Sequence, residues 1–305
     1  LKNAISSNRV SHAFLFAGPR GVGKTSLARI LAKALNCEKG PSPTPCNQCQ
    51  PCREITTGIS VDVLEIDGAS NTSVEDVREL RESVRYMPSS GRYKIYIIDE
   101  VHMLSLSAFN ALLKTLEEPP GHVIFIFATT EPHKVPLTIL SRCQRFNLRR
   151  IPTDQMVGKL KLIAQEEGLM ISEHSLELIA RQALGSLRDA QSLLDQLISY
   201  AGKEIKDTDT IELLGLADRT ILYETVQAII DRAPWRCLEL TQRVYESGYD
   251  VKQFGEALLV HLRNLLIVRV AQETKGLLEL SPDEVVRLKE QSKKLSTEEL
   301  QWLFN

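Results

Sequence analysis

The sequence has no long apolar run, no excess of either charge and no low-complexity tract. A membrane-spanning helix needs about 18 or more consecutive apolar residues, which this chain lacks, so we expect none. The first residues show no secretory signal pattern, which favours a cytoplasmic protein. Lys and Arg total 37 against 39 Asp and Glu, so any DNA contact must be local rather than driven by a broad basic field. Because the chain starts without Met and stops inside an apolar pattern, we expect a longer parent protein.

What is present is an alternation of short apolar runs with amphipathic stretches in the first half. This pattern is typical of an α/β domain, a parallel sheet with helices on both faces. After residue 151 the strand pattern gives way to helical spacing, and a second break falls at residues 215–218. We predict an α/β domain at 1–151, a small helical domain at 152–215 and a helical C-terminal domain at 216–305. The predicted strands are Ala13–Ala17, Val61–Ile66, Tyr93–Ile98, Val123–Ala128 and Cys143–Leu148.

A complete phosphate-binding loop pattern, G-x4-G-K-S/T, lies between the first predicted strand and a predicted helix. Glycines let such a loop curl, so that backbone N–H groups and the helix N-terminus surround phosphate oxygens. Lys24 would reach the outer phosphates, and the Thr25 hydroxyl would bind Mg²⁺. We therefore expect ATP to be bound by Gly18, Gly21, Val22, Gly23, Lys24, Thr25 and Ser26.

Two acidic residues, Asp99 and Glu100, follow the apolar run that ends at Ile98. A carboxylate at the end of a neighbouring strand is the second Mg²⁺ ligand that such a site requires, and we assign it to Asp99. Glu100 is then placed to polarise the attacking water. The plainer alternative is that both acids only cap the following helix, because negative charge is stabilising at a helix N-terminus. Together with the intact phosphate loop, the pair predicts hydrolysis.

Four of the six cysteines form a C-x8-C-x2-C-x2-C pattern at residues 37–52. Four thiolates suffice for tetrahedral Zn²⁺ and leave no open position, so the site is predicted to be structural. The intervening segment is rich in Pro and poor in apolar residues, so a metal would stabilise what a core cannot. An iron–sulfur cluster or unbound thiols are the alternatives. The predicted zinc ligands are Cys37, Cys46, Cys49 and Cys52.

These motifs together resemble the AAA+ ATPases, and among them the gamma/tau family of bacterial DNA polymerase III clamp-loader subunits. The resemblance rests on the phosphate loop, the cysteine insertion and four further segments. It covers the first 200 residues more strongly than the rest. The further segments are Ser11–Phe16 (SHAFLF), Asp99–Leu104 (DEVHML), Leu112–Pro120 (LLKTLEEPP) and Ser141–Cys143 (SRC).

The resemblance implies roles for polar residues outside the two nucleotide motifs. Thr130 falls where AAA+ proteins carry a polar sensor residue, often Asn, although Thr129 is an alternative at the same strand end. Arg142 corresponds to an arginine finger that acts in trans, in the ATP site of a neighbouring subunit. Arg188, in a small lid domain, corresponds to a second sensor that contacts the γ-phosphate of its own subunit.

Partners also follow from the resemblance alone. It implies a pentamer with delta and delta-prime subunits and other copies of this chain, which uses ATP to open the beta sliding clamp around primed DNA. Residues 216–305 would form the oligomerising collar. Lys114 lies in the segment that matches a helix contacting DNA phosphates in the family. The segment Asn71–Ser73 is neutral at a place where relatives can be basic. The alternatives are another AAA+ DNA motor of the branch-migration type, or a non-hydrolysing scaffold of the delta-prime type.

Overall fold

The computed structural model describes residues 1–7, 9–70, 80, 82–215, 219–248, 250–271, 278 and 282–304. The chain forms two compact units, residues 1–159 with 183–192, and residues 160–182 with 193–305. The predicted division into three domains stays a prediction. Residues 216–218, which directly follow its second boundary, lie outside the described part, as do Asn71–Ser73.

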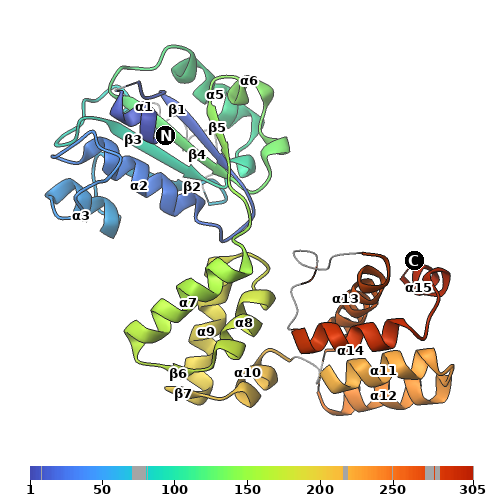
Figure 1. Cartoon of the computed structure of the whole chain (residues 1–305). Helices are drawn as coiled ribbons and strands as arrows, with labels where there is room; N and C mark the ends of the chain where they lie inside the picture. The colour runs from blue at the N-terminus through green and yellow to red at the C-terminus, as the bar shows by residue number, and fades with distance from the viewer. Residues whose placement is uncertain are drawn as a thin grey trace. The chain divides into compact units, whose positions relative to one another are not determined.

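The first unit is built on a five-stranded parallel sheet in the order β2-β3-β4-β1-β5 (Figure 1). β1 is an interior strand that pairs with β4 on one side and β5 on the other, and its residues are fully or almost fully buried. Strands buried on both faces read as continuous apolar runs, which is what made them recognisable in the sequence. The strands are β1 (Ala13–Ala17), β2 (Val63–Asp67), β3 (Lys94–Asp99), β4 (Val123–Thr129) and β5 (Gln144–Asn147).

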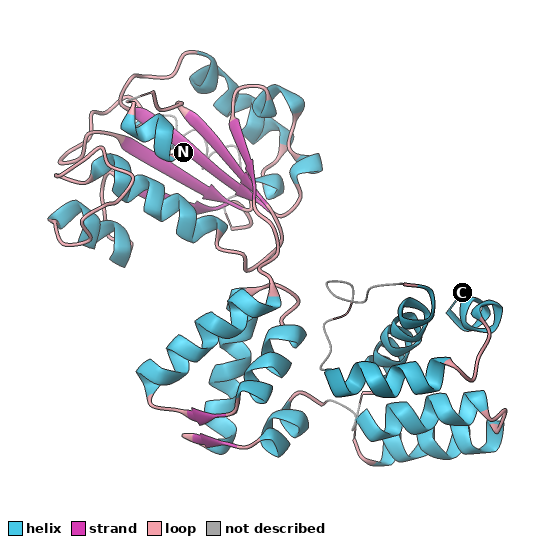
Figure 2. Cartoon of the chain, in the orientation of Figure 1, coloured by secondary structure: helices cyan, strands magenta, loops and turns pink. Residues whose placement is uncertain are grey.

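Alternate residues of these strands enter two separate cores, one on each face of the sheet. Phe14, Phe16 and their counterparts on β3 and β4 pack against α2, while Leu15 packs with the opposite set against α5 and α6. Figure 2 shows helices on both faces of the sheet. The predicted fold class is therefore confirmed. The helices here are α1 (Lys2–Ser6), α2 (Lys24–Asn36), α3 (Gln50–Thr57), η1 (Val101–Met103), α5 (Leu106–Glu117), η2 (Pro132–Lys134) and α6 (Leu137–Leu140).

In the described part of residues 152–304, the elements are helices and one short strand pair. β6 and β7 are two-residue strands that pair in parallel within the 152–215 segment. The last helices pack around two small apolar clusters. The elements are α7 (Thr153–Glu167), β6 (Met170–Ile171), α8 (Glu173–Gln182), α9 (Leu187–Ala201), β7 (Glu204–Ile205), α10 (Asp207–Leu213), α11 (Arg219–Ile230), α12 (Pro234–Glu246), α13 (Val251–Val270), α14 (Pro282–Ser292) and α15 (Thr297–Phe304). Within the described ranges, no helix is long and apolar enough to cross a membrane.

All five predicted strands are present; the bounds of β1 match the prediction, and those of the other four differ by one or two residues. The largest difference is at β2, which begins at Val63 rather than Val61. The preceding Asp62 turns its carboxylate to three backbone N–H groups of Ser89, Ser90 and Gly91, at 2.6–2.8 Å. This contact anchors the segment that leads into β3, and an apolar pattern cannot reveal it.

Candidate nucleotide site and cysteine cluster

The phosphate loop joins β1 to α2 and relies on glycine at two crowded positions. A Cβ at Gly18 would lie 2.6 Å from the carbonyl oxygen of Leu148, so the backbones can approach only because the side chain is absent. Gly21 has φ of 72°, and a Cβ there would lie 1.8 Å from the Ser186 hydroxyl. The sequence pattern is therefore met by a loop conformation that L side chains rarely adopt.

Lys24 starts α2, and its ammonium group is held inside the loop. Its Nζ donates to the carbonyl oxygens of Gly18 at 3.1 Å and Pro19 at 3.0 Å. Burial lowers the pKa of Lys24, while the nearby carboxylates of Glu100 and Asp99 oppose that shift. The side chain therefore lies near both acids at the end of β3.

Thr25 and Asp99 meet as the sequence predicts, because β3 ends beside the phosphate loop. The Thr25 hydroxyl donates to Oδ2 of Asp99. The other carboxylate oxygen, Oδ1, accepts from the backbone N–H of Glu100 at 2.9 Å. A hydroxyl and a carboxylate are oxygen ligands of the kind Mg²⁺ prefers, so the donor set fits this ion.

Glu100 has a left-handed backbone conformation, with φ of 43°, directly after β3. Its Oε2 accepts from the backbone N–H of Thr130 at 3.2 Å and from the Thr130 hydroxyl at 2.9 Å. Thr129, by contrast, is fully buried, and its hydroxyl contacts His102 and the backbone N–H of Glu131. Of the two threonines left open by the sequence, Thr130 is the one that contacts Glu100.

A cavity of ≈ 550 Å³ opens beside these groups and includes Arg188 among its lining residues. The start of α9 lies against the phosphate loop, where the Leu187 backbone N–H donates to the Gly21 carbonyl at 3.0 Å. The structure thus brings Arg188, predicted from a distant part of the sequence, to the cavity that Asp99 and Glu100 line. Val22 lies in the loop and Ser26 is exposed on the first turn of α2.

Arg142 is not part of this cluster. It follows α6, where its guanidinium pairs with Glu117 at 2.7 Å and donates to the Thr138 carbonyl at 2.7 Å. Neither partner is among the residues that line the cavity. Lys114, the predicted DNA contact, is exposed on α5.

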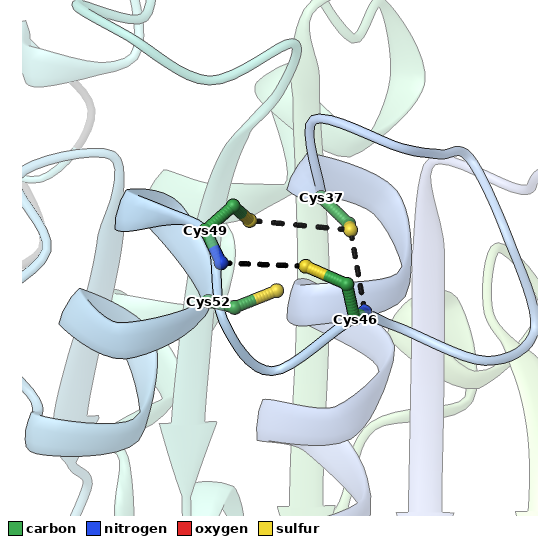
Figure 3. Close-up of side chains that lie close together, drawn as sticks. All are labelled: Cys37, Cys46, Cys49 and Cys52. Carbon is green, nitrogen blue, oxygen red and sulfur yellow. Dashed lines mark hydrogen bonds between the residues drawn. The ribbon is translucent and has the colours of Figure 1, made fainter.

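The four predicted zinc ligands come together at the C-terminal end of α2 and the start of α3 (Figure 3). Their sulfur atoms all lie within 4.8 Å of one another, and those of Cys37 and Cys49 are 4.0 Å apart. Tetrahedral Zn²⁺ with Zn–S bonds of about 2.3 Å needs sulfur atoms about 3.8 Å apart, so the donor set fits zinc.

The cysteine environments differ in how readily each thiol ionises. Backbone N–H groups of Gln48 and Cys49 lower the pKa of Cys46 to about 6. Burial raises the pKa of Cys52 to about 12. A bound divalent cation would offset the cost of ionising the buried thiol.

Sequence reasoning missed two groups beside the acids. His102, on η1, has a side chain only 6% exposed and places Nδ1 3.3 Å from Oε2 of Glu100. Arg29, on α2, forms a two-point ion pair with Glu65 at 2.7 and 2.8 Å, and both residues line the cavity. A signal for His102 was available, since it follows Glu100 by two residues, but its partners on β4 become visible only in the fold.

The sheet order, the phosphate loop, the strand-end acids and the returning helical segment define a nucleotide-binding domain of the AAA+ class. The fold resembles the Thermotoga maritima RuvB Holliday junction branch migration motor, with a TM-score of 0.52 and 20% identity over 84% of this chain and 80% of that chain. At this identity the likeness concerns the fold alone.

Three family models together match almost the whole chain. "DNA polymerase III, delta subunit" matches residues 1–152 and "DNA polymerase III clamp loader subunit, ATPase lid domain" matches residues 155–203. "DNA polymerase III subunits gamma and tau domain III" matches residues 205–305.

Curated relatives give the same result. DNA polymerase III subunit tau of Bacillus subtilis is 48% identical over 94% of this chain, and the Escherichia coli subunit is 48% identical over 87%. Subunit gamma of Buchnera aphidicola is 42% identical over 89% of this chain and 74% of its own length. The chain therefore belongs to the gamma/tau family of DNA polymerase III subunits. It spans 51% of the Bacillus protein and 41% of the Escherichia protein.

Proposed function

We propose that this chain is the ATP-binding and hydrolysing motor subunit of a bacterial clamp loader, which uses ATP to open a beta sliding clamp and load it onto primed DNA. The observation that carries the proposal is that Lys24 and Thr25 lie beside Asp99 and Glu100, and that these two acids line a cavity together with Arg188. A site that only binds nucleotide has little use for an acid placed like Glu100. Membership in the gamma/tau family supports the same assignment.

In this proposal each residue has a distinct task. The phosphate loop and the N-terminus of α2 bind the triphosphate, and Lys24 reaches its outer oxygens. Mg²⁺ held by Thr25 and Asp99 would neutralise charge on the phosphate oxygens. Glu100 would accept a hydrogen bond from the attacking water and so activate it. Thr130, as the sensor, would fix the Glu100 carboxylate through its hydroxyl.

Two arginines complete the site from different directions. Arg188 binds the γ-phosphate of the ATP in the site of its own chain. It thereby draws the helical lid, proposed as residues 152–215, toward the triphosphate. Arg142 of a neighbouring copy supplies positive charge to the transferring phosphoryl group. Since Arg142 lies apart from its own cavity, hydrolysis would depend on assembly.

The remaining proposals concern assembly. Residues 216–305 are proposed as the oligomerising collar, in a complex with delta and delta-prime subunits and other copies of this chain. Zn²⁺ bound by the four cysteines would hold the insertion at 37–52. DNA would be contacted through phosphates without sequence readout, with Lys114 as a candidate.

The proposal is tested by ATP turnover of the full-length protein assembled with delta and delta-prime, with and without beta clamp and primed DNA. We expect clamp and DNA together to raise turnover. Glu100→Gln should lower kcat at least about 100-fold while ATP binding persists, because the variant removes the group that activates water. Turnover that ignores clamp and DNA would point to another AAA+ DNA motor. Unchanged turnover in Glu100→Gln would contradict the assignment of Glu100.

A further inference from the structure

His102 is a buried histidine with a carboxylate near each ring nitrogen. Its Nδ1 lies 3.3 Å from Oε2 of Glu100, and its Nε2 lies 3.5 Å from Oε1 of Glu131. The side chain is 6% exposed, so water competes little for either nitrogen. The ring thus bridges the proposed water-activating acid and a second acid on a different loop.

The position of this ring is fixed by the end of β4. The Thr129 hydroxyl lies 3.0 Å from Nδ1 of His102 and accepts from the backbone N–H of Glu131 at 3.0 Å. Thr129 is fully buried, so it anchors both the ring and the start of the following loop to the sheet. Three contacts, to Thr129, Glu100 and Glu131, therefore define how the imidazole is oriented.

Among the described residues, the hydrogen bonds to the Glu100 carboxylate fall on one of its two oxygens. Oε2 receives the Thr130 hydroxyl and backbone N–H, and it is also the oxygen that faces His102. With Thr130 donating to Oε2 and His102 close to the same oxygen, the carboxylate would be held in one rotation, which would leave Oε1 to accept from a water molecule. A general base gains from such a fixed orientation because small displacements of a reacting group are costly in rate.

We propose that His102 is a positioning residue for hydrolysis, with Nδ1 fixing the Glu100 carboxylate and Glu131 orienting the ring through Nε2. The arrangement follows a general rule, in which a catalytic group is oriented by a second group that is itself oriented by a third. The inference rests on the proposed role of Glu100 and adds a residue to it.

Two substitutions separate the contribution of Nδ1 from that of Nε2. Asn at position 102 places an amide nitrogen close to the position of Nδ1, whereas Gln places one close to the position of Nε2. His102→Asn should therefore keep the contact to Glu100, and His102→Gln should keep only the contact to Glu131. We expect His102→Gln to lower kcat for ATP about tenfold to 100-fold, and His102→Asn to recover most of that loss.

The measurement uses the full-length protein assembled with delta, delta-prime, clamp and primed DNA, and it determines kcat and KM separately. KM for ATP should stay within about twofold, since an interaction needed only in the transition state leaves ground-state binding unchanged. Two readouts independent of turnover, the affinity for a non-hydrolysable ATP analogue and the thermal unfolding midpoint without nucleotide, should be alike in the Asn and Gln variants.

Glu100→Gln serves as the reference in the same assay. If Glu100→Gln lowers kcat but both His102 variants retain it, only the role of His102 is wrong. The role is equally contradicted if the two variants lose activity alike, if Gln recovers activity better than Asn, or if the loss lies in KM or in folding. If Glu100→Gln itself leaves kcat unchanged, the proposed function fails first.

Discussion

The phosphate loop and the cysteine loop lie at opposite ends of α2 and are held in shape by different means. Before Lys24, the loop follows a fully buried strand and depends on glycine conformations that the packed surroundings impose. After Asn36, none of residues 38–50 is buried, and four thiols gather instead. A sheet can thus hold a functional loop by packing, whereas an insertion that leaves the core needs another source of stability.

The largest expected effect comes from removing one of the proposed zinc ligands of the cysteine loop. Cys52→Ser should abolish zinc binding, because structural zinc contributes about 10–16 kcal/mol of apparent binding free energy in small zinc domains. Metal content by elemental analysis, with protease sensitivity of residues 37–52, measures this. Cys237→Ser, which changes a cysteine outside the cluster, is the matched control and should retain zinc. Full zinc content in Cys52→Ser would show that this cysteine is not needed to bind the metal.

Gly21→Ala tests the other loop. The alanine Cβ would meet the Ser186 hydroxyl at 1.8 Å in a backbone with φ of 72°. We expect the free energy of unfolding to fall by about 3 kcal/mol and nucleotide affinity to drop. Denaturant titration and a binding assay measure the two effects. Gly121→Ala, where no atom lies within 4 Å of the added Cβ, should change neither. Equal stability and affinity in the two variants would show that the packing around Gly21 does not require glycine.

Asp62 provides a pH test of a polar anchor within the sheet. Burial raises the pKa of Asp62, but backbone N–H groups of Gly91, Ser89 and Ser90 outweigh that effect and lower it below the ordinary value. A lowered folded-state pKa contributes stability above the unfolded pKa of about 3.9, and this stability is lost as the pH falls through the folded pKa.

Asp62→Asn should therefore cost about 2 kcal/mol at neutral pH, because hydrogen bonds to a charged acceptor become neutral ones. Unfolding free energies measured from neutral pH down to the acid limb should converge for the wild type and the variant. A difference that stays constant over this range would show that the carboxylate charge does not matter.

The smallest effect is expected at the ion pair between Arg142 and Glu117. Their side chains are 33% and 51% exposed, so the pair should contribute less than about 1 kcal/mol to the stability of this chain. A double-mutant cycle with Glu117→Ala and Arg142→Ala isolates the coupling. A coupling above about 2 kcal/mol would mean that this surface contact supports the fold more than a solvated pair can.

Much of the fold could be predicted from the sequence because each buried strand is a short apolar run with a clear end. The phosphate loop and the four cysteines could be predicted because their chemistry requires fixed residue types at fixed spacings. The family resemblance supplied Arg142 and Arg188, which no local pattern distinguishes from ordinary surface arginines.

What could not be predicted depends on which strands are neighbours. His102 meets Thr129 and Glu131 only because β3 and β4 lie side by side, and Thr130 is distinguished from Thr129 only by the direction of its side chain. The anchoring of residues 89–91 by Asp62 likewise joins segments that no periodicity connects. These contacts are tertiary, so residue spacing carries no record of them.

The central claim, that ATP is hydrolysed at a site completed by Arg142 of a neighbouring copy, is tested most directly by mixing two inactive variants. Lys24→Ala removes a group of the chain's own site, and Arg142→Ala removes the group offered to the neighbour. Assembled separately with the partner subunits, each variant should show little DNA-stimulated turnover. Mixed before assembly, they should recover part of it, because a Lys24→Ala copy can supply Arg142 to an intact site on an Arg142→Ala copy. Mixed assemblies that form but remain as inactive as the separate variants would contradict the account.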